Sequence, residues 1–447
     1  MIPQSEYLQR RQRLMAQLPQ GSAVLVASGV NQSRGNDTEF PFSQDSDFYY
    51  LTGFNEPNAW LYMSNFALNA DGSDPSSSQN HHSVLFCQPK DKAMEIWHGL
   101  RLGVEQACDA LLVDEAMEID DLEEALPELL NNHAQVYFLL GSNGDDEALI
   151  FSALQVLRSA PKQSKSAPSC IVDLAPVLHE MRLIKSAAEI QVMQKAADIS
   201  CEAHKRAMLY AKPGVYEYQL EGEILHEFVM SGARTPAYNT IVGSGVNACI
   251  LHYTNNHSAL KDGDLVLIDA GANYQGYAAD ITRTFPANGK FTEEQATLYN
   301  LVLQSQLQAM EILVPGGTFK QATDKAVEII CTGLIELGIL SGSLEDNVKN
   351  MTWRAFFMHG LGHWLGLNVH DVGMYKINGE DRPLQPGMVL TVEPGIYIDH
   401  DADVEDKWKG IGIRIEDNIL ITEQGNVVLT AAVPKTIADI EALMAQR

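Results

Sequence analysis

The first third of the chain alternates short apolar runs with segments whose apolar residues recur at helical spacing. SAVLVAS from Ser22, SVLFCQP from Ser83 and QVYFLLGS from Gln135 have the length and composition of buried strands. VEQACDALL from Val104 and DEALIFSALQVLRSA from Asp146 follow the helical period. Strands that alternate with helices are typical of an α/β domain, so we expect that class for this part of the chain.

A polar segment, APKQSKSAPS at 160–169, separates this domain from the rest of the chain. We place the boundary near Asp173, because a long helical pattern that includes KSAAEIQVMQKAADISCEAHKRAM begins soon afterwards. Within that pattern His204 is expected on the polar side, facing solvent. The serine-rich segment 69–82 has the composition of an exposed loop. The predicted domains are therefore residues 1–173 and 174–447.

The second domain contains two similar stretches of sequence. LKDGDLVLIDAG from Leu260 aligns without gaps on LQPGMVLTVEPG from Leu384, and this alignment places Asp269 on Glu393. Upstream of them, KPGVYE is echoed by VPGGTF. Internal duplication and a chance match of short segments are both compatible with these observations. On either interpretation, each stretch carries an acidic residue at the end of a strand-like apolar run.

Composition and charge exclude several classes of function. The chain has 447 residues, with 58 acidic and 31 basic side chains and a formal net charge of −27. This excess of negative charge repels polyphosphate, so nucleic acid is not expected as a partner. No apolar run reaches the ~18 residues of a membrane span, and we expect neither a signal peptide nor membrane association. Six widely spaced cysteines without a CxxC motif favour a reducing, cytoplasmic compartment, with all six thiols buried.

The stretch GDLVLIDAGANYQGYAADITRTF is typical of a strand, a turn and a second strand. With the turn at Asn273–Gly276, a symmetric hairpin places the carboxylates of Asp269 and Asp280 directly opposite one another. Two like charges in such a pair are destabilising, but a cation between them removes the repulsion. The alternative is that both aspartates merely cap turns.

The second half repeats this layout in GMVLTVEPGIYI and GIGIRIEDNILI. Glu393 and Glu416 lie within apolar strand runs, where an unpaired carboxylate is costly. Arg414 stands two residues before Glu416 and therefore shares its face of the strand, so a structural ion pair between them is the alternative. Four acids in paired apolar strands nevertheless favour a metal site.

Three histidines, at positions 359, 363 and 370, fall within the segment MHGLGHWLGLNVHD. The spacing of His359 and His363 resembles the HExxH motif of zinc proteases, but Gly360 stands where that motif has glutamate. Two further glycines argue against a helix, so we expect a loop or a short irregular helix. A carboxylate-rich set with one nitrogen donor suits manganese, cobalt or zinc, and spacing alone leaves open which histidine binds.

The ordered set HYT, IDAG, AADITRTF, MHGLGHWLGLNVHDVG, LTVEPGIYI and GIRIEDNILIT resembles the signature of the pita-bread metallopeptidases. Within them it is most similar to the aminopeptidase P group, and FPFSQDSDFYYLTGFNEPNA and EIWHGLRLG extend the resemblance into the first domain. The resemblance implies an α+β chain. Its C-terminal pita-bread domain, a duplicated β-sheet with covering helices, comes after an α/β N-terminal domain.

By the same resemblance, five residues bind two divalent ions, with Asp280 and Glu416 bridging them and His363 as the implied histidine ligand. Mn²⁺ is the expected metal, with Co²⁺ or Zn²⁺ as alternatives. Two such ions would activate water and polarise the scissile carbonyl, and one ligand, Glu393, would also shuttle the proton. The implied ligands are Asp269, Asp280, His363, Glu393 and Glu416.

The resemblance also implies residues that contact the substrate. His252, His359 and His370 match substrate-site histidines, of which the last two would stabilise the reacting carbonyl. Val369, His370 and Tyr397 would surround a proline ring, and Arg414 would orient Tyr397. Trp97 is either part of a wall at the entrance or an ordinary core tryptophan, and His98 departs from the aromatic residue more common in the group.

The implied activity is metal-dependent release of the N-terminal residue from peptides with proline in second position. The expected partners are such peptides and further copies of the chain, as a dimer or a tetramer. A prolidase, which cleaves only Xaa-Pro dipeptides, is the nearest alternative. A non-catalytic pita-bread binding module is a more distant one, and the metal-free creatinases would not retain all five ligands.

Overall fold

The computed structural model describes residues 1–66 and 81–447. Most of the serine-rich segment expected as an exposed loop, 69–80, lies outside the described residues. The end of that segment is described, and there His82 opens strand β3 (His82–Cys87). Among the described helices, none combines the length and the apolar composition that a bilayer crossing requires.

The chain divides into two compact units, Ile2–Arg182 and Leu183–Arg447, the second together with Met1. The division falls at the end of helix α7 (Ala175–Leu183) rather than near Asp173. The contacts of Asp47 in helix α2 (Ser46–Thr52) account for this position. Its carboxylate lies 2.7 Å from the guanidinium of Arg182 and 3.1 Å from the imidazole of His179, both on α7.

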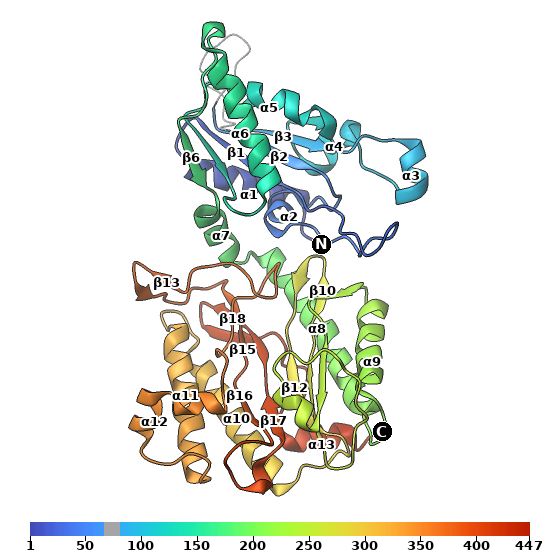
Figure 1. Cartoon of the computed structure of the whole chain (residues 1–447), viewed down its shortest axis with the longest axis vertical. Coiled ribbons are helices and arrows are strands. Elements are labelled where there is room, and N and C mark those ends of the chain that lie inside the picture. The colour runs from blue at the N-terminus through green and yellow to red at the C-terminus, as the bar shows by residue number, and fades with distance from the viewer. Residues whose placement is uncertain (67–80) are drawn as a thin grey trace. The chain divides into compact units, whose positions relative to one another are not determined.

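The N-terminal unit is built on one six-stranded sheet in the order β4-β3-β2-β1-β5-β6. Strands β1 and β2 are antiparallel, whereas β5 pairs in parallel with both β1 and β6. Helices α5 and α6 contribute apolar side chains to the core on one face of this sheet (Figure 1). This mixed α/β architecture confirms the predicted class. The further elements are β1 (Ser22–Ala27), β2 (Trp60–Ser64), β4 (Glu115–Glu118), β5 (Gln135–Phe138), β6 (Cys170–Asp173), α1 (Gln4–Gln17), α3 (Lys92–His98), α4 (Val104–Leu111), α5 (Leu122–Leu130) and α6 (Gly144–Ser159).

The C-terminal unit combines short antiparallel sheets with long helices. Helix α9 lies beside β8. Helix α8 lies beside β10, and α10 lies beside β15, β16 and β17 (Figure 1). Capping boxes begin α8, α10 and α11, so serine or threonine side chains satisfy the free main-chain N–H groups there. The elements are β7 (Thr235–Pro236), β8 (Ile241–Ser244), β9 (Leu265–Asp269), β10 (Ala272–Tyr274), β11 (Tyr277–Ala278), β12 (Thr282–Pro286), β13 (Lys376–Ile377), β14 (Glu380–Asp381), β15 (Val389–Val392), β16 (Gly395–Ile398), β17 (Ile411–Arg414), β18 (Asp417–Thr422), β19 (Gly425–Val428), α8 (Ala187–Tyr210), α9 (Glu217–Met230), α10 (Glu293–Ile312), α11 (Phe319–Glu336), α12 (Leu344–Asn350) and α13 (Ile437–Met444).

The two similar stretches of sequence occupy equivalent places in this unit. The N–H of Gly214 donates to the carbonyl of Leu260 at 2.8 Å, and the N–H of Gly316 donates to that of Leu384 at 2.9 Å. In each half the leucine N–H donates back to the residue after the glycine. Both glycines have left-handed backbones, with φ of 91° and 85°, which glycine adopts without strain. The repeated hydrogen bonds favour internal duplication over a chance match.

The cysteines only partly follow the prediction. All six are free thiols, but Cys170 is exposed and Cys108 and Cys249 are half-buried. The expectation that every thiol is buried is therefore wrong for half of them. Cys170 opens β6 at the edge of the N-terminal sheet, where side chains meet solvent.

Candidate active site

The first pair of acidic residues lies on a hairpin. The centre of its turn is shifted by one residue from the predicted position, and this shift changes the pairing of the two strands. Asp269 pairs with Thr282 across β9 and β12, so Asp280 is its diagonal rather than its direct neighbour. The turn is centred on Gln275 and Gly276, both left-handed with φ of 52° and 85°. A two-residue turn of this kind matches the strand twist, which explains the shift. The prediction of directly opposed aspartates is therefore wrong, although both stand on the same hairpin.

The second pair is directly opposed. Strands β15 and β18 share one register with β16 and β17, and that register places Glu393 opposite Glu416. Gln306 of α10 reaches this point, and its amide donates to the main-chain carbonyls of Val392 and Ile415 at 3.1 Å each. The amide thus satisfies carbonyl groups beside the two glutamates, where the strands are interrupted.

The three-histidine segment is a loop that runs along strand β15, as the glycines predict. The N–H of Thr391 donates to the carbonyl of His363 at 2.9 Å, and the N–H of Glu393 donates to Leu361 at 2.8 Å. A β-carbon on Gly362 would lie 2.2 Å from the carbonyl oxygen of Thr391. Glycine is therefore required for the loop to approach the strand closely enough to present His363.

The structure brings His363 and three of the four acids together. Its Nε2 lies 3.3 Å from Asp280 Oδ2 and 3.5 Å from Glu393 Oε1. Ligand atoms from Asp280, His363 and Glu416 all lie within 4.8 Å of one another. The other ring nitrogen, Nδ1, is 3.0 Å from the carbonyl of Trp364. A proton on Nδ1 leaves Nε2 free to bind a metal, which is the usual arrangement of a metal-binding histidine.

Asp269 is linked to this cluster through two neighbours. Its Oδ2 accepts a hydrogen bond from Arg414 at 2.6 Å, and its Oδ1 lies 2.5 Å from the hydroxyl of Tyr238. The same hydroxyl contacts Asp280. Arg414 therefore pairs with Asp269, and not with Glu416 as the structural alternative proposed. Tyr238 was not identified from the sequence, because nothing in its surroundings, TPAYNT, marks it as a site residue.

The electrostatics of the cluster fit a divalent metal. Burial and neighbouring carboxylates raise the pKa of Asp280 and of Glu416 well above their usual values. Burial and the charge of Glu416 raise the pKa of Glu393 to about 8. Glu416 Oε2 accepts a hydrogen bond from Thr282 at 2.7 Å, but its buried Oε1 has no partner among the described residues. A cation would bind that oxygen and remove the repulsion among the acids.

A second group of side chains borders this cluster. The Tyr397 hydroxyl is buried between Arg414 Nη1 at 2.9 Å and His359 Nε2 at 2.8 Å. Burial and nearby Arg414 lower the pKa of His359 to about 4, so its ring is neutral at pH 7. His359 Nδ1 is also occupied, at 2.8 Å from the Gly360 carbonyl. Both ring nitrogens of His359 therefore have hydrogen-bond partners in this arrangement.

The remaining predicted residues lie in different settings. The ring of His370 packs edge-on against that of His363, with centroids 4.1 Å apart, and His370 is an exposed residue. His252 is exposed and Val369 is half-buried. Trp97, on α3 of the N-terminal unit, is 82% exposed, and every residue of α3 is at least partly exposed. The core interpretation of Trp97 is therefore wrong.

His204 is the clearest departure from the sequence prediction. It is 1% exposed rather than facing solvent, and its Nε2 donates to the carbonyl of Ala270 at 3.0 Å. One turn earlier, the hydroxyl of Ser200 accepts from the N–H of Ala272 at 2.9 Å. Helix α8 thus holds the chain where it leaves Asp269. The signal was present, because position 204 continues the apolar stripe of the helix at helical spacing.

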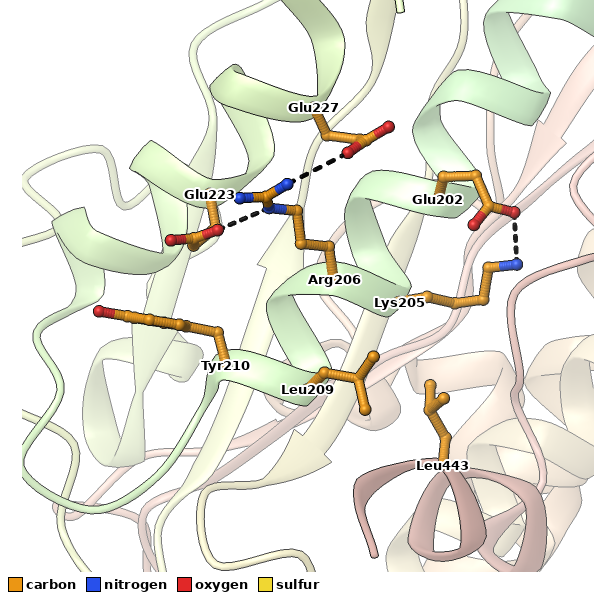
Figure 2. Close-up of a pocket in the computed structure, with 8 residues that line it drawn as sticks. All are labelled: Glu202, Lys205, Arg206, Leu209, Tyr210, Glu223, Glu227 and Leu443. Atoms are coloured by element: carbon orange, nitrogen blue, oxygen red, sulfur yellow. Dashed lines mark hydrogen bonds and ion pairs between the residues drawn. The ribbon is translucent and has the colours of Figure 1, made fainter. Parts of the chain in front are cut away.

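A separate open pocket, of about 570 Å³, lies among α8, α9 and α13. Figure 2 shows that its charged side chains point toward one another. Arg206 pairs with Glu223 at 2.6 Å and with Glu227 at 3.4 Å, and Lys205 pairs with Glu202 at 2.5 Å. Because these charges are already compensated, the pocket lacks the unsatisfied groups that mark the acidic cluster.

Comparison with known proteins agrees with the fold and with the chemistry of the cluster. Residues 191–423 match Metallopeptidase family M24, and residues 7–137 match the Aminopeptidase P, N-terminal domain. The chain is 49% identical to the Xaa-Pro aminopeptidase of Escherichia coli K12 over 445 residues, 99% of this chain and 98% of that protein. Its identity to the Xaa-Pro aminopeptidase of Haemophilus influenzae, and the coverage of both chains, are the same.

Solved structures agree with these matches. A zinc-substituted E. coli aminopeptidase P in complex with product has a TM-score of 0.95 and 48% identity, covering 100% of this chain and 99% of that chain. Proline aminopeptidase P II from Yersinia pestis has a TM-score of 0.95 and 50% identity, covering 100% of both chains. The chain therefore belongs to metallopeptidase family M24, the pita-bread metallopeptidases, and within it to the Xaa-Pro aminopeptidase (aminopeptidase P) group.

Proposed function

We propose that this chain releases the N-terminal residue from peptides with proline in second position by means of two divalent ions bound in the acidic cluster. The observation that supports this site is the buried convergence of carboxylates around His363, with one oxygen of Glu416 left without a partner among the described residues. Asp280 and Glu416, the most buried of the acids, would bridge the two ions. The proposed ligands are Asp269, Asp280, His363, Glu393 and Glu416.

Manganese is the proposed metal, because four carboxylates and one imidazole form an oxygen-rich set, and cobalt or zinc are the alternatives. When bound, two divalent ions supply an activated water near neutral pH and polarise the scissile carbonyl. Binding of Asp269 to a metal requires its Oδ1 or Oδ2 to be shared with Tyr238 or Arg414. These two neighbours would hold the carboxylate in place while it binds.

The side chains around the cluster would then move the proton and bind the substrate. Glu393 takes the proton from the attacking water and delivers it to the proline nitrogen as the peptide bond breaks. His370 donates to the developing oxyanion, an interaction worth roughly 3 kcal/mol. His252 contacts the substrate, and His359 keeps Tyr397 and its partner Arg414 oriented.

Substrate selection would depend on a pocket that accommodates the proline ring and on an entrance that is closed to longer chains. Val369, His370 and Tyr397 surround the proline ring in this proposal. Trp97, whose large apolar surface is exposed, would form part of the wall that limits the chain before the proline to one residue. We propose a cytoplasmic homo-oligomer, a dimer or a tetramer, in which neighbouring copies complete that wall.

A cleavage screen tests this function. Metal-stripped protein is supplied with Mn²⁺, Co²⁺ or Zn²⁺ and assayed on Xaa-Pro dipeptides and on longer Xaa-Pro peptides. Release of the first residue from the longer peptides is expected, whereas activity confined to dipeptides would indicate a prolidase. Absence of both metal and hydrolysis in the parent protein would indicate a binding module. Glu393→Ala and Asp280→Ala are each expected to abolish hydrolysis, and undiminished turnover in the latter would refute the bridging role.

A further inference from the structure

Glu217, at the first residue of α9, accepts an unusual number of hydrogen bonds. Its side chain is fully buried, with 0% exposure. Oε1 accepts from the N–H and the hydroxyl of Ser244 at 2.7 Å each and from the amide of Asn247 at 3.0 Å. Oε2 accepts from the hydroxyl of Tyr253 at 2.9 Å and from the N–H of Ser258 at 2.8 Å. Both carboxylate oxygens are therefore fully engaged.

The donors belong to one stretch of chain, residues 244–258, which we call the His252 segment. Its first and last residues, Ser244 and Ser258, both bind Glu217, and so does Tyr253, the direct neighbour of His252. The amide of Asn247 also reaches the hydroxyl of Ser258 at 2.9 Å. The carboxylate thus closes this segment into a loop, with His252 beside one of its five attachment points.

His252 itself needs such support, because its side chain is exposed. It lies near the candidate active site, because its chain neighbours Leu251 and Tyr253 pack against a core cluster that contains Tyr397. An exposed imidazole on a loop contributes to catalysis only if the loop is held within a fraction of an ångström.

All five donors to Glu217 are uncharged main-chain, hydroxyl or amide groups. Because Glu217 has no cationic partner among the residues that the structure describes, it depends on these donors, and hydrogen bonds to an ionised acceptor are about twice as strong as neutral ones. Displacement of the segment would leave a buried charge unsatisfied, which is strongly unfavourable. The five hydrogen bonds to Glu217 therefore keep the segment in one position.

We propose that Glu217 is a positioning residue of the peptidase, acting through the His252 segment to hold His252 against the substrate. This inference rests on the proposed role of His252 in binding substrate. Replacement by glutamine retains the size of the side chain but exchanges one acceptor oxygen for an amide donor. That amide would face groups that are themselves donors, so the segment and His252 would shift.

The test is a double-mutant cycle on the metal-loaded, full-length enzyme. Glu217→Gln, His252→Ala and their combination are compared by kcat/KM on a proline-containing tripeptide, with metal content and unfolding temperature measured for each. Glu217→Gln is expected to lower kcat/KM by about 10- to 100-fold, the scale of loss for a displacement near 1 Å. In the His252→Ala background the same change is expected to cause little further loss.

Two further variants separate positioning from general loss of stability. Tyr253→Phe removes one donor without adding another, and its smaller loss is also expected to vanish in the His252→Ala background. Glu189→Gln is the matched control, because Glu189 is 2% exposed in the first turn of α8 and accepts a hydrogen bond from Tyr277 at 2.9 Å. Glu189→Gln and His252→Ala are expected to act independently, so the loss of kcat/KM in the double variant should equal the product of the two single losses.

The outcomes distinguish the two proposals. If His252→Ala lowers activity and the Glu217→Gln effect multiplies with it, the positioning role is overturned while the substrate role of His252 stands. If His252→Ala leaves kcat/KM unchanged, the substrate role of His252 fails and the positioning role fails with it. Loss of metal from Glu217→Gln would also overturn the proposal, because the expected effect leaves the metal ligands in place.

Discussion

His204 is expected to make the stability of the C-terminal unit sensitive to mild acid. Burial is the main cause that lowers the pKa of this imidazole to about 4, from an ordinary value of 6.5. Its Nε2 donates to Ala270, and its buried Nδ1 has no hydrogen-bond partner within residues 1–66 and 81–447. A second proton on the ring would therefore place a charge in an apolar, unsatisfied position.

The sign and size of the effect are set by that pKa. Below pH 6.5 the unfolded chain binds a proton at His204 that the folded chain does not bind, so stability present above pH 6.5 is lost as the pH falls toward 4. Within this window, each pH unit lowers the free energy of unfolding by about 1.4 kcal/mol. Between about pH 6.5 and pH 5, His204 alone is expected to remove about 2 kcal/mol from the free energy of unfolding.

His204→Gln isolates this contribution, because glutamine can donate to the Ala270 carbonyl but does not titrate. Both proteins are unfolded at a series of pH values in the presence of a chelator, so that metal occupancy does not vary with pH. The parent protein is expected to lose about 2 kcal/mol more than the variant, or about 4–8 °C in unfolding temperature. Other titrating groups are common to both proteins and cancel in the difference.

Exposed His226, on α9, provides the matched control. The same substitution there is expected to change stability by no more than about 0.5 kcal/mol at any pH in the series. A parallel pH dependence of the parent protein and His204→Gln would refute the reasoning, because it would show that the folded protein protonates His204 as readily as the unfolded chain does.

Three further predictions concern single contacts. Tyr238→Phe removes the hydroxyl shared by two proposed ligands and is expected to weaken metal binding by about 10- to 100-fold in calorimetric titration, whereas unchanged affinity would contradict this role. Asp417→Ala leaves Arg283 buried and unpaired, so urea unfolding should show a loss of about 3–5 kcal/mol; a loss below about 1 kcal/mol would speak against it. Gly362→Ala would place a β-carbon 2.2 Å from a carbonyl oxygen of β15 and should lower peptide hydrolysis by about 100-fold, whereas Gly360→Ala, with its nearest neighbours at 3.9 Å, should retain most activity.

Most residues of the candidate site could be proposed from the sequence, because charged side chains are unfavourable in the apolar segments that contain them. Acids such as Glu393 and Glu416 interrupt apolar strand runs, and the glycines around His363 exclude a regular helix. A buried charge needs compensation wherever the strand lies, so these positions indicate a cation without any knowledge of the fold. The same local logic predicted the strands, the long helix α8 and the loop beside β15.

The detailed pairing within the site depended on local backbone geometry that the pattern did not resolve. The hairpin register was set by the left-handed pair Gln275 and Gly276, so Asp269 and Asp280 became diagonal rather than opposed. A shift of one position in a turn changes every cross-strand partner. Alternation of apolar residues indicates which face a strand buries, but not which residue lies across from it.

Taken alone, the sequence predicted a two-domain α+β chain, several of the strands and helices in each domain, and a set of acids and histidines proposed to hold metal. The tertiary structure alone decided that Tyr238 joins two aspartates, that Glu217 closes the His252 segment and that Trp97 is exposed. The physical reason is that periodicity and residue type predict the conformation and the buried face of one helix or strand at a time. Partners such as Glu217 and Ser258 lie far apart in the chain, and only the packing of separate elements brings them within hydrogen-bonding distance.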